Sequence, residues 1–144
     1  MGTETMGRVL AEATIENLED LWAARRYRLR PEQVRRIVVK DALVDTGARM
    51  LSLPTRLIRQ LGLDQVDTRQ VTTSAGVREA AVYDVVRLTI QGRSCGMDVM
   101  EVPDEAPVLI GQLPRERLDF VIDPGAGTLI GNPAHGGEYM IEAY

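Results

Sequence analysis

Residues 40–54 read KDALVDTGARMLSLP, and the interpretation of the whole chain depends on this stretch. An apolar segment, Ala42 to Val44, runs into Asp45-Thr46-Gly47 and is followed by further apolar residues. The acidic residue therefore stands where a strand should still be entering a core. Asp45 is a turn former, the cap of a helix or an acid with a chemical role, and this segment alone leaves the three open.

Length and composition predict one domain with an aliphatic core. The chain has 144 residues, of which 44% are hydrophobic and only 4% aromatic. A net charge of −4 gives no general attraction to nucleic acid or to an anionic membrane, so we expect neither as a partner. The single cysteine, Cys95, excludes an internal disulfide and favours a reducing compartment. We see no membrane-spanning run and no signal peptide, and expect a cytoplasmic protein.

Hydrophobic patterning predicts short strands separated by turns. Apolar and polar residues alternate over 7–17, which is typical of a half-buried strand, whereas 18–26 suits either a short helix or a long turn. Short helices are predicted after Pro54, ending near Gly62, and at 112–118. Further strands are predicted at 34–40, 66–73, 77–83, 84–91, 94–102, 107–111, 119–123, 128–132 and in the tail 138–144.

Two hairpins follow from the same pattern. One has a small tip at Ser74-Ala75-Gly76, and the other turns at Gly92-Arg93. Many short strands with regular turns predict a mainly β, closed or barrel-like domain with one or two short helices. The glycine-rich stretch 125–131 has the wrong spacing for a dinucleotide site, and we interpret it as a turn.

The chain resembles the retropepsin-like aspartic proteases in three places, which occur in family order. These are Leu43-Val44-Asp45-Thr46-Gly47-Ala48, the hairpin around Ser74-Ala75-Gly76, and Val108-Leu109-Ile110-Gly111 with its following helix. The resemblance implies a closed retropepsin-like barrel and a single domain over residues 1–144. In that domain 1–33 form an N-terminal strand and extension, 34–123 form the family core, and 124–144 form C-terminal strands and tail.

The resemblance also implies a site and a mechanism. Asp45 would be catalytic, supported by Thr46, Gly47 and Ala48 in its loop. Thr73, Ser74, Ala75 and Gly76 would form a flap that binds a peptide or protein substrate, and Leu109, Ile110 and Gly111 would shape the site from below. Two nearby carboxylates that share one proton can act as base and acid, without metal or cofactor.

One chain offers a single good copy of this loop. Asp123-Pro124-Gly125 also follows an apolar strand, but Pro124 replaces the threonine, so we interpret it as a turn. The resemblance therefore implies a homodimer in which each subunit contributes one Asp45.

Two positions depart from the family pattern. Arg49 and Gln112 stand where retroviral members usually carry a charged pair that secures the dimer. For Arg49 the sequence leaves three alternatives open: contact with substrate, an ion pair with Glu116, or an ion pair with another acid. The rival hypothesis is a catalytically weak or inactive dimeric module of the same fold that binds peptides or serves as a scaffold.

Other reactive residues are few. His135 is the only histidine, so a serine or cysteine nucleophile with a histidine base would require it, and a zinc site is not expected. We interpret its segment as a turn or a packing contact that can also line a cleft, and Cys95 as a small core residue. Arginines at 25, 26, 28, 30, 35 and 36 form a basic patch, for which we expect solvent exposure or salt bridges to the Glu-rich segment 8–19 rather than nucleic-acid binding.

Overall fold

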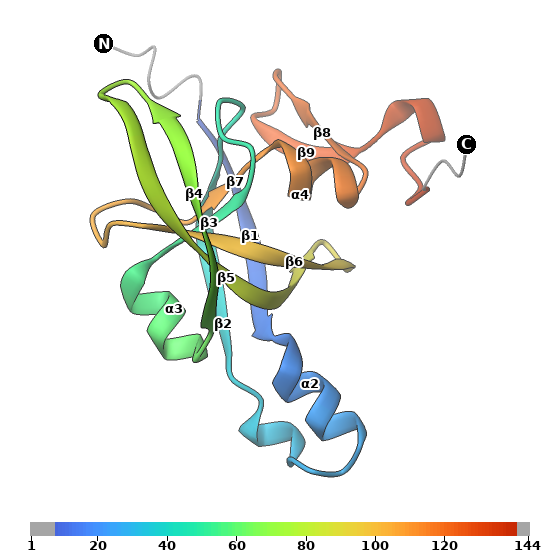
Figure 1. Cartoon of the computed structure of the whole chain (residues 1–144). Coiled ribbons are helices and arrows are strands. Elements are labelled where there is room, and N and C mark those ends of the chain that lie inside the picture. The colour runs from blue at the N-terminus through green and yellow to red at the C-terminus, as the bar shows by residue number, and fades with distance from the viewer. Residues whose placement is uncertain (1–7, 141–144) are drawn as a thin grey trace.

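The computed structural model describes residues 8–140, and in this range the chain is mainly β with a few short helices (Figure 1). The strands are β1 (Val9–Asn17), β2 (Arg36–Val44), β3 (Leu51–Pro54), β4 (Asp64–Thr73), β5 (Gly76–Ile90), β6 (Arg93–Val102), β7 (Leu109–Ile110), β8 (Phe120–Asp123) and β9 (Thr128–Gly131). The helices are α2 (Leu18–Arg25), α3 (Thr55–Leu61) and α4 (Gln112–Arg117), with 3-10 turns η1 (Pro31–Gln33) and η2 (Pro133–His135). No helix within residues 8–140 is long and apolar enough to cross a bilayer.

Most of the described strands belong to one sheet in the order β1-β2-β7-β3-β6-β5-β4, and β1 also pairs with β5. β8 and β9 form a separate hairpin. The short β7 lies between β2, to which it is parallel, and β3, to which it is antiparallel. The connection from β2 to β3 therefore has to pass over the end of β7.

An aliphatic core holds these strands together, as the composition predicts. The alternation in β1 is confirmed, because Val9, Ala13 and Ile15 are buried while Leu10 and Glu12 are exposed. The largest buried side chains elsewhere in the sheet are leucine, isoleucine and valine, among them Leu51, Leu53, Leu88, Ile110 and Val99.

Local capping explains the ends of the helices. The Asn17 side chain accepts a hydrogen bond from the Asp20 amide, at 3.0 Å, and donates to the Leu61 carbonyl, at 2.8 Å. This cap makes 18–25 a helix, which resolves the choice between helix and turn. Pro54 precedes α3 and Gly62 ends it with a φ of 66°, the left-handed conformation that glycine adopts at little cost.

Two predicted details require correction. The second hairpin turns at Gln91-Gly92, both with positive φ, and Arg93 already belongs to β6; the predicted turn at Gly92-Arg93 was one residue late. Residues 138–140 form no strand, and the rest of the predicted tail strand lies outside the described residues. The turn at 124–127 between β8 and β9 is confirmed.

Candidate active site

The loop that contains Asp45 is held at the end of β2. The Leu43 amide donates to the Val108 carbonyl, at 2.8 Å, and the Asp45 amide donates to the Ile110 carbonyl, at 3.0 Å. These bonds continue the parallel β2–β7 pairing by one residue beyond Val44. Asp45 is therefore the last residue of this segment whose backbone is hydrogen-bonded to β7, and the sheet fixes the position from which its carboxylate projects.

Gly111 lies directly beneath this loop. Its amide donates to the Met50 carbonyl, at 3.1 Å, and the next amide, of Gln112, donates to the Ala48 carbonyl, at 3.0 Å. A Cβ atom on Gly111 would lie 2.6 Å from the Arg49 carbonyl carbon and from the Met50 oxygen. Only glycine lets the two backbone segments approach so closely.

The Asp45 carboxylate is half-buried and partly oriented. Its Oδ1 accepts a hydrogen bond from the Gly47 amide, at 2.9 Å, while its second oxygen accepts none within residues 8–140. Thr46 and Gly47 are exposed, and the Thr46 hydroxyl makes no hydrogen bond in the described part of the chain. One carboxylate oxygen is thus fixed and the other remains available to water, a proton or a second carboxyl group.

Gly47 lies in the turn at 46–47 that follows Asp45. Its φ is not positive, and an added Cβ would meet only Asp45 Oδ1, at 3.4 Å, which is an ordinary contact. Within one chain this turn therefore does not itself require glycine. The position that sterically requires glycine is Gly111, which packs against the backbone of loop 45–50.

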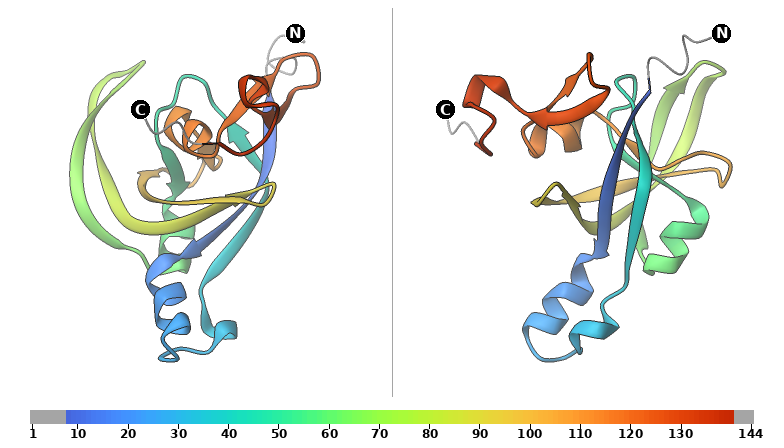
Figure 2. Two further views of the ribbon diagram at one scale, coloured as in Figure 1. Left: turned by 90° about the vertical axis from the view of Figure 1, so that its right-hand side faces the viewer. Right: turned by 180° about the vertical axis from the view of Figure 1, so that it is seen from behind.

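The predicted flap residues form the tip of the β4–β5 hairpin. The Thr73 hydroxyl donates to the Gly76 carbonyl, at 2.9 Å, and accepts from the Ala75 amide, at 3.2 Å. Ser74, Ala75 and Gly76 are exposed. The tip and loop 45–50 lie at the same end of the molecule in all three ribbon views (Figures 1 and 2). Within residues 8–140, no hydrogen bond joins the tip to the loop.

The two departures from the family pattern have different surroundings. Within residues 8–140 the Arg49 side chain is in no ion pair, so of the alternatives left open it does not pair with Glu116 or with another acid of this range. Glu116 instead accepts a hydrogen bond from the Gln112 side chain, at 3.2 Å, along α4. Arg49 thus carries a free positive charge four residues after Asp45.

Asp123 has the turn role that the sequence predicts. Its Oδ1 accepts hydrogen bonds from the amides of Gly125, at 3.0 Å, and Ala126, at 3.4 Å, in the turn that joins β8 to β9. The interpretation of Asp123-Pro124-Gly125 as a turn is therefore confirmed.

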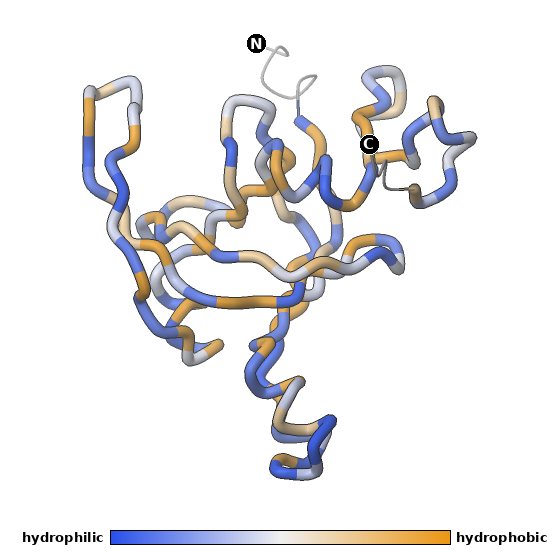
Figure 3. Tube along the Cα trace, turned by 45° about the vertical axis from the view of Figure 1, so that its right-hand side comes forward, coloured by the Kyte–Doolittle hydropathy of each residue, from blue (hydrophilic) through white to orange (hydrophobic). Residues whose placement is uncertain are grey.

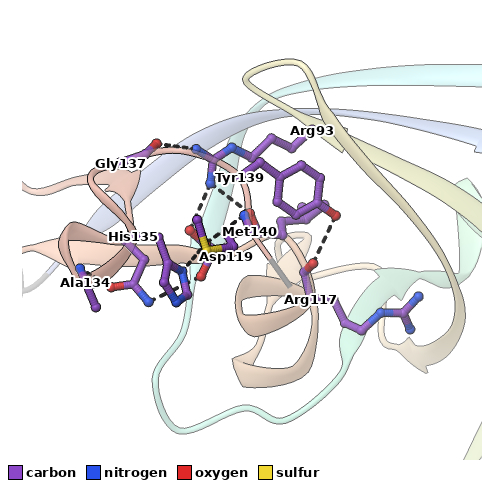
Figure 4. A network of polar contacts seen from close by, with 10 residues as sticks. Arg93, Arg117, Asp119, Ala134, His135, Gly137, Tyr139 and Met140 are labelled. Atoms are coloured by element: carbon purple, nitrogen blue, oxygen red, sulfur yellow. Dashed lines mark hydrogen bonds and ion pairs between the residues drawn. The ribbon is translucent and has the colours of Figure 1, made fainter. Parts of the chain in front are cut away.

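His135 contacts an acid that the sequence analysis did not single out (Figure 4). Its Nδ1 lies 2.7 Å from Asp119 Oδ2, and the same carboxylate accepts bonds from the Asn132 side chain and the Met140 amide. The bond with His135 lowers the pKa of Asp119 most, and this effect outweighs burial. A cavity of about 680 Å³ adjoins the pair, and its described lining has no serine or cysteine.

Arg93 holds the same region together from β6. Its guanidinium donates to the carbonyls of Leu118, Asp119 and Gly137 at 2.6–3.0 Å (Figure 4). It also stacks on the Phe120 ring at 4.6 Å. No sequence signal marks this network, because its partners lie 25 to 44 residues away. Cys95 is half-buried against the core, where burial raises the pKa of its thiol, which fits a packing role.

The described residues 8–140 contain no cluster of three or more histidine, cysteine, aspartate or glutamate side chains that could hold a metal ion. A sequence model of the aspartyl protease family matches residues 36–113, more than half of the chain. The chain belongs to the aspartyl protease family. The matched range of this aspartyl protease begins with β2, contains Asp45 and the β4–β5 hairpin, and ends just after Gly111. No curated protein matches the chain.

Proposed function

We propose that this aspartyl protease is an endopeptidase whose catalytic dyad consists of one Asp45 from each subunit of a homodimer. The observation that carries the proposal is the construction of the Asp45 loop. A buried strand ends at the acid, Gly111 supports the loop from below, and the Gly47 amide orients one oxygen. Family membership and the hairpin at the same end of the molecule support the same conclusion.

The second carboxylate comes from a second chain in this proposal. Asp123, the only other acid in a comparable sequence position, uses its oxygen inside its own turn. A two-fold axis would bring two Asp45 loops together, with Thr46 donating across the axis to the other loop. The proposal treats residues 1–144 as one retropepsin-like domain, in which the β1–β5 pairing closes the sheet into a barrel.

The chemistry follows from the shared proton. Two close carboxyl groups do not both ionise easily, so one is protonated while the other is a base. The base takes a proton from water as the water oxygen attacks the peptide carbonyl carbon, and the acid protonates the carbonyl oxygen. The C–N bond of the resulting gem-diol then breaks as the dyad gives a proton to the amine nitrogen, and one hydroxyl of the gem-diol returns a proton to the dyad while it becomes the new carboxyl group. The dyad therefore again holds one proton.

The substrate is a peptide or an unfolded protein segment. An extended peptide would lie beneath the β4–β5 tip, form main-chain hydrogen bonds as a strand does, and place alternate side chains in pockets. The tip, in which Ser74, Ala75 and Gly76 are exposed, has small side chains and can open and close over it. No metal or cofactor enters this mechanism.

A second candidate function is a dimeric module that binds peptides with little or no cleavage. Arg49 favours it, because an unpaired positive charge near the loop replaces the usual acid. This charge would bind an acidic side chain of a peptide while opposing the dimer contacts of the family. The same experiment separates the two functions.

The test is cleavage of a diverse peptide library from roughly pH 4 to 7, where such a dyad can share a proton. Wild type is compared with Asp45→Asn, and Asp123→Asn is the matched control because both acids accept from the second amide after them. Sedimentation of the same samples gives the oligomeric state. We expect cleavage by wild type and Asp123→Asn and none by Asp45→Asn, with all three dimeric.

Two results would contradict the endopeptidase. Equal cleavage by wild type and Asp45→Asn would exclude Asp45 as the catalytic acid. A folded dimer that binds library peptides but cleaves none would support the binding module instead.

A further inference from the structure

The segment between β1 and β2 projects from the domain. α2 and η1 extend away from the sheet, at the end opposite loop 45–50 and the β4–β5 tip (Figures 1 and 2). No residue of α2 or η1 is buried. We define the basic tip as Trp22 together with residues 25–30, which read RRYRLR. In Figure 3 this projection is mostly hydrophilic, with isolated apolar residues.

The arginines of this region fall into two groups. Arg36 pairs with Glu16 at 2.9 Å, which confirms an expected salt bridge to segment 8–19, and Arg35 pairs with Asp20, just beyond that segment, at 2.8 Å. Within residues 8–140 the three arginines nearest the end of α2 are in no ion pair, and Arg30 has only an exposed contact with Glu32 at 3.6 Å. The three are Arg25, Arg26 and Arg28. These three side chains are exposed, which is the other alternative that the sequence analysis gave for the basic patch.

Tyr27 is both strained and exposed. It follows the end of α2 with a φ of 60°, and the amides of Tyr27 and Arg28 donate back to the carbonyls of Ala24 and Ala23. This is the helix ending in which glycine is the preferred left-handed residue. The chain places a tyrosine there and leaves 97% of it exposed, so no contact within the described residues compensates the strain. Strained residues that persist without such a contact favour a functional explanation.

The aromatic and basic side chains gather at one place. A shallow cavity of about 330 Å³ is lined by Tyr27, Arg28, Leu29 and Arg30, together with Ala24, Pro31 and Gln33. Trp22, on the preceding helix, is 41% exposed. The tip thus combines amphipathic aromatic rings, one apolar side chain and unpaired guanidinium groups.

We propose that the basic tip docks this protein on an anionic lipid surface. Residues 21–33 hold four arginines and one glutamate, a local charge of +3, whereas the whole chain carries −4. The overall charge, which gave no expectation of membrane binding, therefore conceals a local attraction. Clustered arginines are attracted to acidic headgroups, and tyrosine and tryptophan favour the interface between water and hydrocarbon.

The shape of the tip favours a lipid surface over nucleic acid. Single-stranded nucleic acid binds in a groove that follows its backbone, and duplex DNA needs an element that fits a groove. The basic tip is a convex projection whose arginines lie mostly in the turn after α2. A bilayer surface can contact such a projection without a matching groove. The proposal does not depend on the proposed protease activity, and binding there leaves loop 45–50 accessible at the other end.

The test is co-sedimentation of the full chain with phosphatidylcholine vesicles, with and without phosphatidylserine. We expect binding only with phosphatidylserine and release by salt. Arg26→Gln with Arg28→Gln should weaken it roughly 30-fold, from a roughly fivefold effect of each arginine. Arg56→Gln with Arg59→Gln, which removes the same charge from exposed positions of α3, should leave binding unchanged.

Tyr27→Gly separates binding from folding. Glycine relieves the left-handed strain, so the variant should unfold at the same or a higher temperature and still bind phosphatidylserine vesicles less tightly than wild type. Unchanged binding of Tyr27→Gly would contradict the role of the ring.

Three further results would overturn the proposal. The first is that the full chain does not bind phosphatidylserine vesicles at low salt. The second is that the arginine variants of the tip and of α3 lose vesicle binding equally. The third is that the chain binds a labelled single-stranded RNA, that the tip variant abolishes this RNA binding, and that vesicles do not compete with the RNA. The last result would assign the tip to nucleic acid.

Discussion

Replacing Gly111 by alanine should lower stability by an amount that the structure allows us to estimate. The new Cβ would lie 2.6, 2.6 and 2.8 Å from backbone atoms of Arg49, Met50 and Ala48, whereas ordinary contacts begin at 3.4 Å. Gly111 has a φ of −85°, which alanine tolerates, so the cost is steric. Inserting a methyl group into a packed site costs about 1–3 kcal/mol, and backbone atoms cannot rotate away as side chains do. We expect a loss of about 3 kcal/mol, the upper end of that range.

Thermal and urea unfolding measure this loss directly. A destabilisation of about 3 kcal/mol corresponds to a fall of roughly 6–12 °C in the midpoint for a domain of this size. Hydrogen exchange should show the amides of Gly111 and Gln112 losing protection, because their bonds to the loop must break if the loop moves. Gly47→Ala is the matched control, since its methyl group meets only Asp45 Oδ1 at 3.4 Å. Equal midpoints for both variants, or a Gly111→Ala midpoint equal to wild type, would refute the reasoning.

Three further predictions concern other buried polar groups. Ser52→Ala should raise the free energy of unfolding by about 1 kcal/mol in urea titrations, because the buried hydroxyl has no partner within the described residues. Asp119→Asn should reduce the loss of stability in acid. The pKa of Asp119 is lowered in the folded state, so its carboxylate stabilises the fold above the unfolded pKa of about 3.9, and this stabilisation disappears as pH falls through the folded pKa. Unfolding midpoints measured across that pH range for wild type and Asp119→Asn test the difference. Arg93→Gln should increase hydrogen exchange in residues 132–140, because the Gly137 carbonyl loses its charged donor; unchanged exchange would contradict this.

Local signals in the sequence predicted the elements that local forces determine. Alternation identified β1, small polar residues identified the tip at Ser74-Ala75, and Gly62 identified the end of α3, because each depends on neighbours in the chain. The matched range 36–113 lies inside the expected family core, 34–123, and the division of the chain into core, extension and tail stays a prediction. The single-residue error at Gln91-Gly92 has the same origin, because either residue pair suits a tight turn and only φ distinguishes them.

Contacts between distant segments were not predictable in the same way. The need for glycine at position 111 exists only because loop 45–50 crosses over it, and this crossing depends on β7 lying between β2 and β3. The contact between Asp119 and His135 spans 16 residues and involves an aspartate with a φ of 59°, for which the sequence carries no marker. Net charge likewise did not indicate the basic tip, because it averages over the whole chain, whereas the run of arginines at 25–30 is visible in the sequence.

Asp45 and Asp123 show why a tripeptide does not by itself determine a function. In both turns Oδ1 accepts a hydrogen bond from the second amide after the acid, at 2.9 and 3.0 Å, so the local geometry is nearly identical. Asp123 belongs to the tip of a two-stranded hairpin, where the bond only closes the turn. At Asp45 the amide of the acid itself bonds to Ile110, and the residues after it lie on the backbone of Gly111. That second set of contacts fixes the position of the carboxylate relative to the sheet, which a catalytic acid requires and a turn does not. Asp45→Asn and Asp123→Asn should therefore preserve both turns and differ only in cleavage.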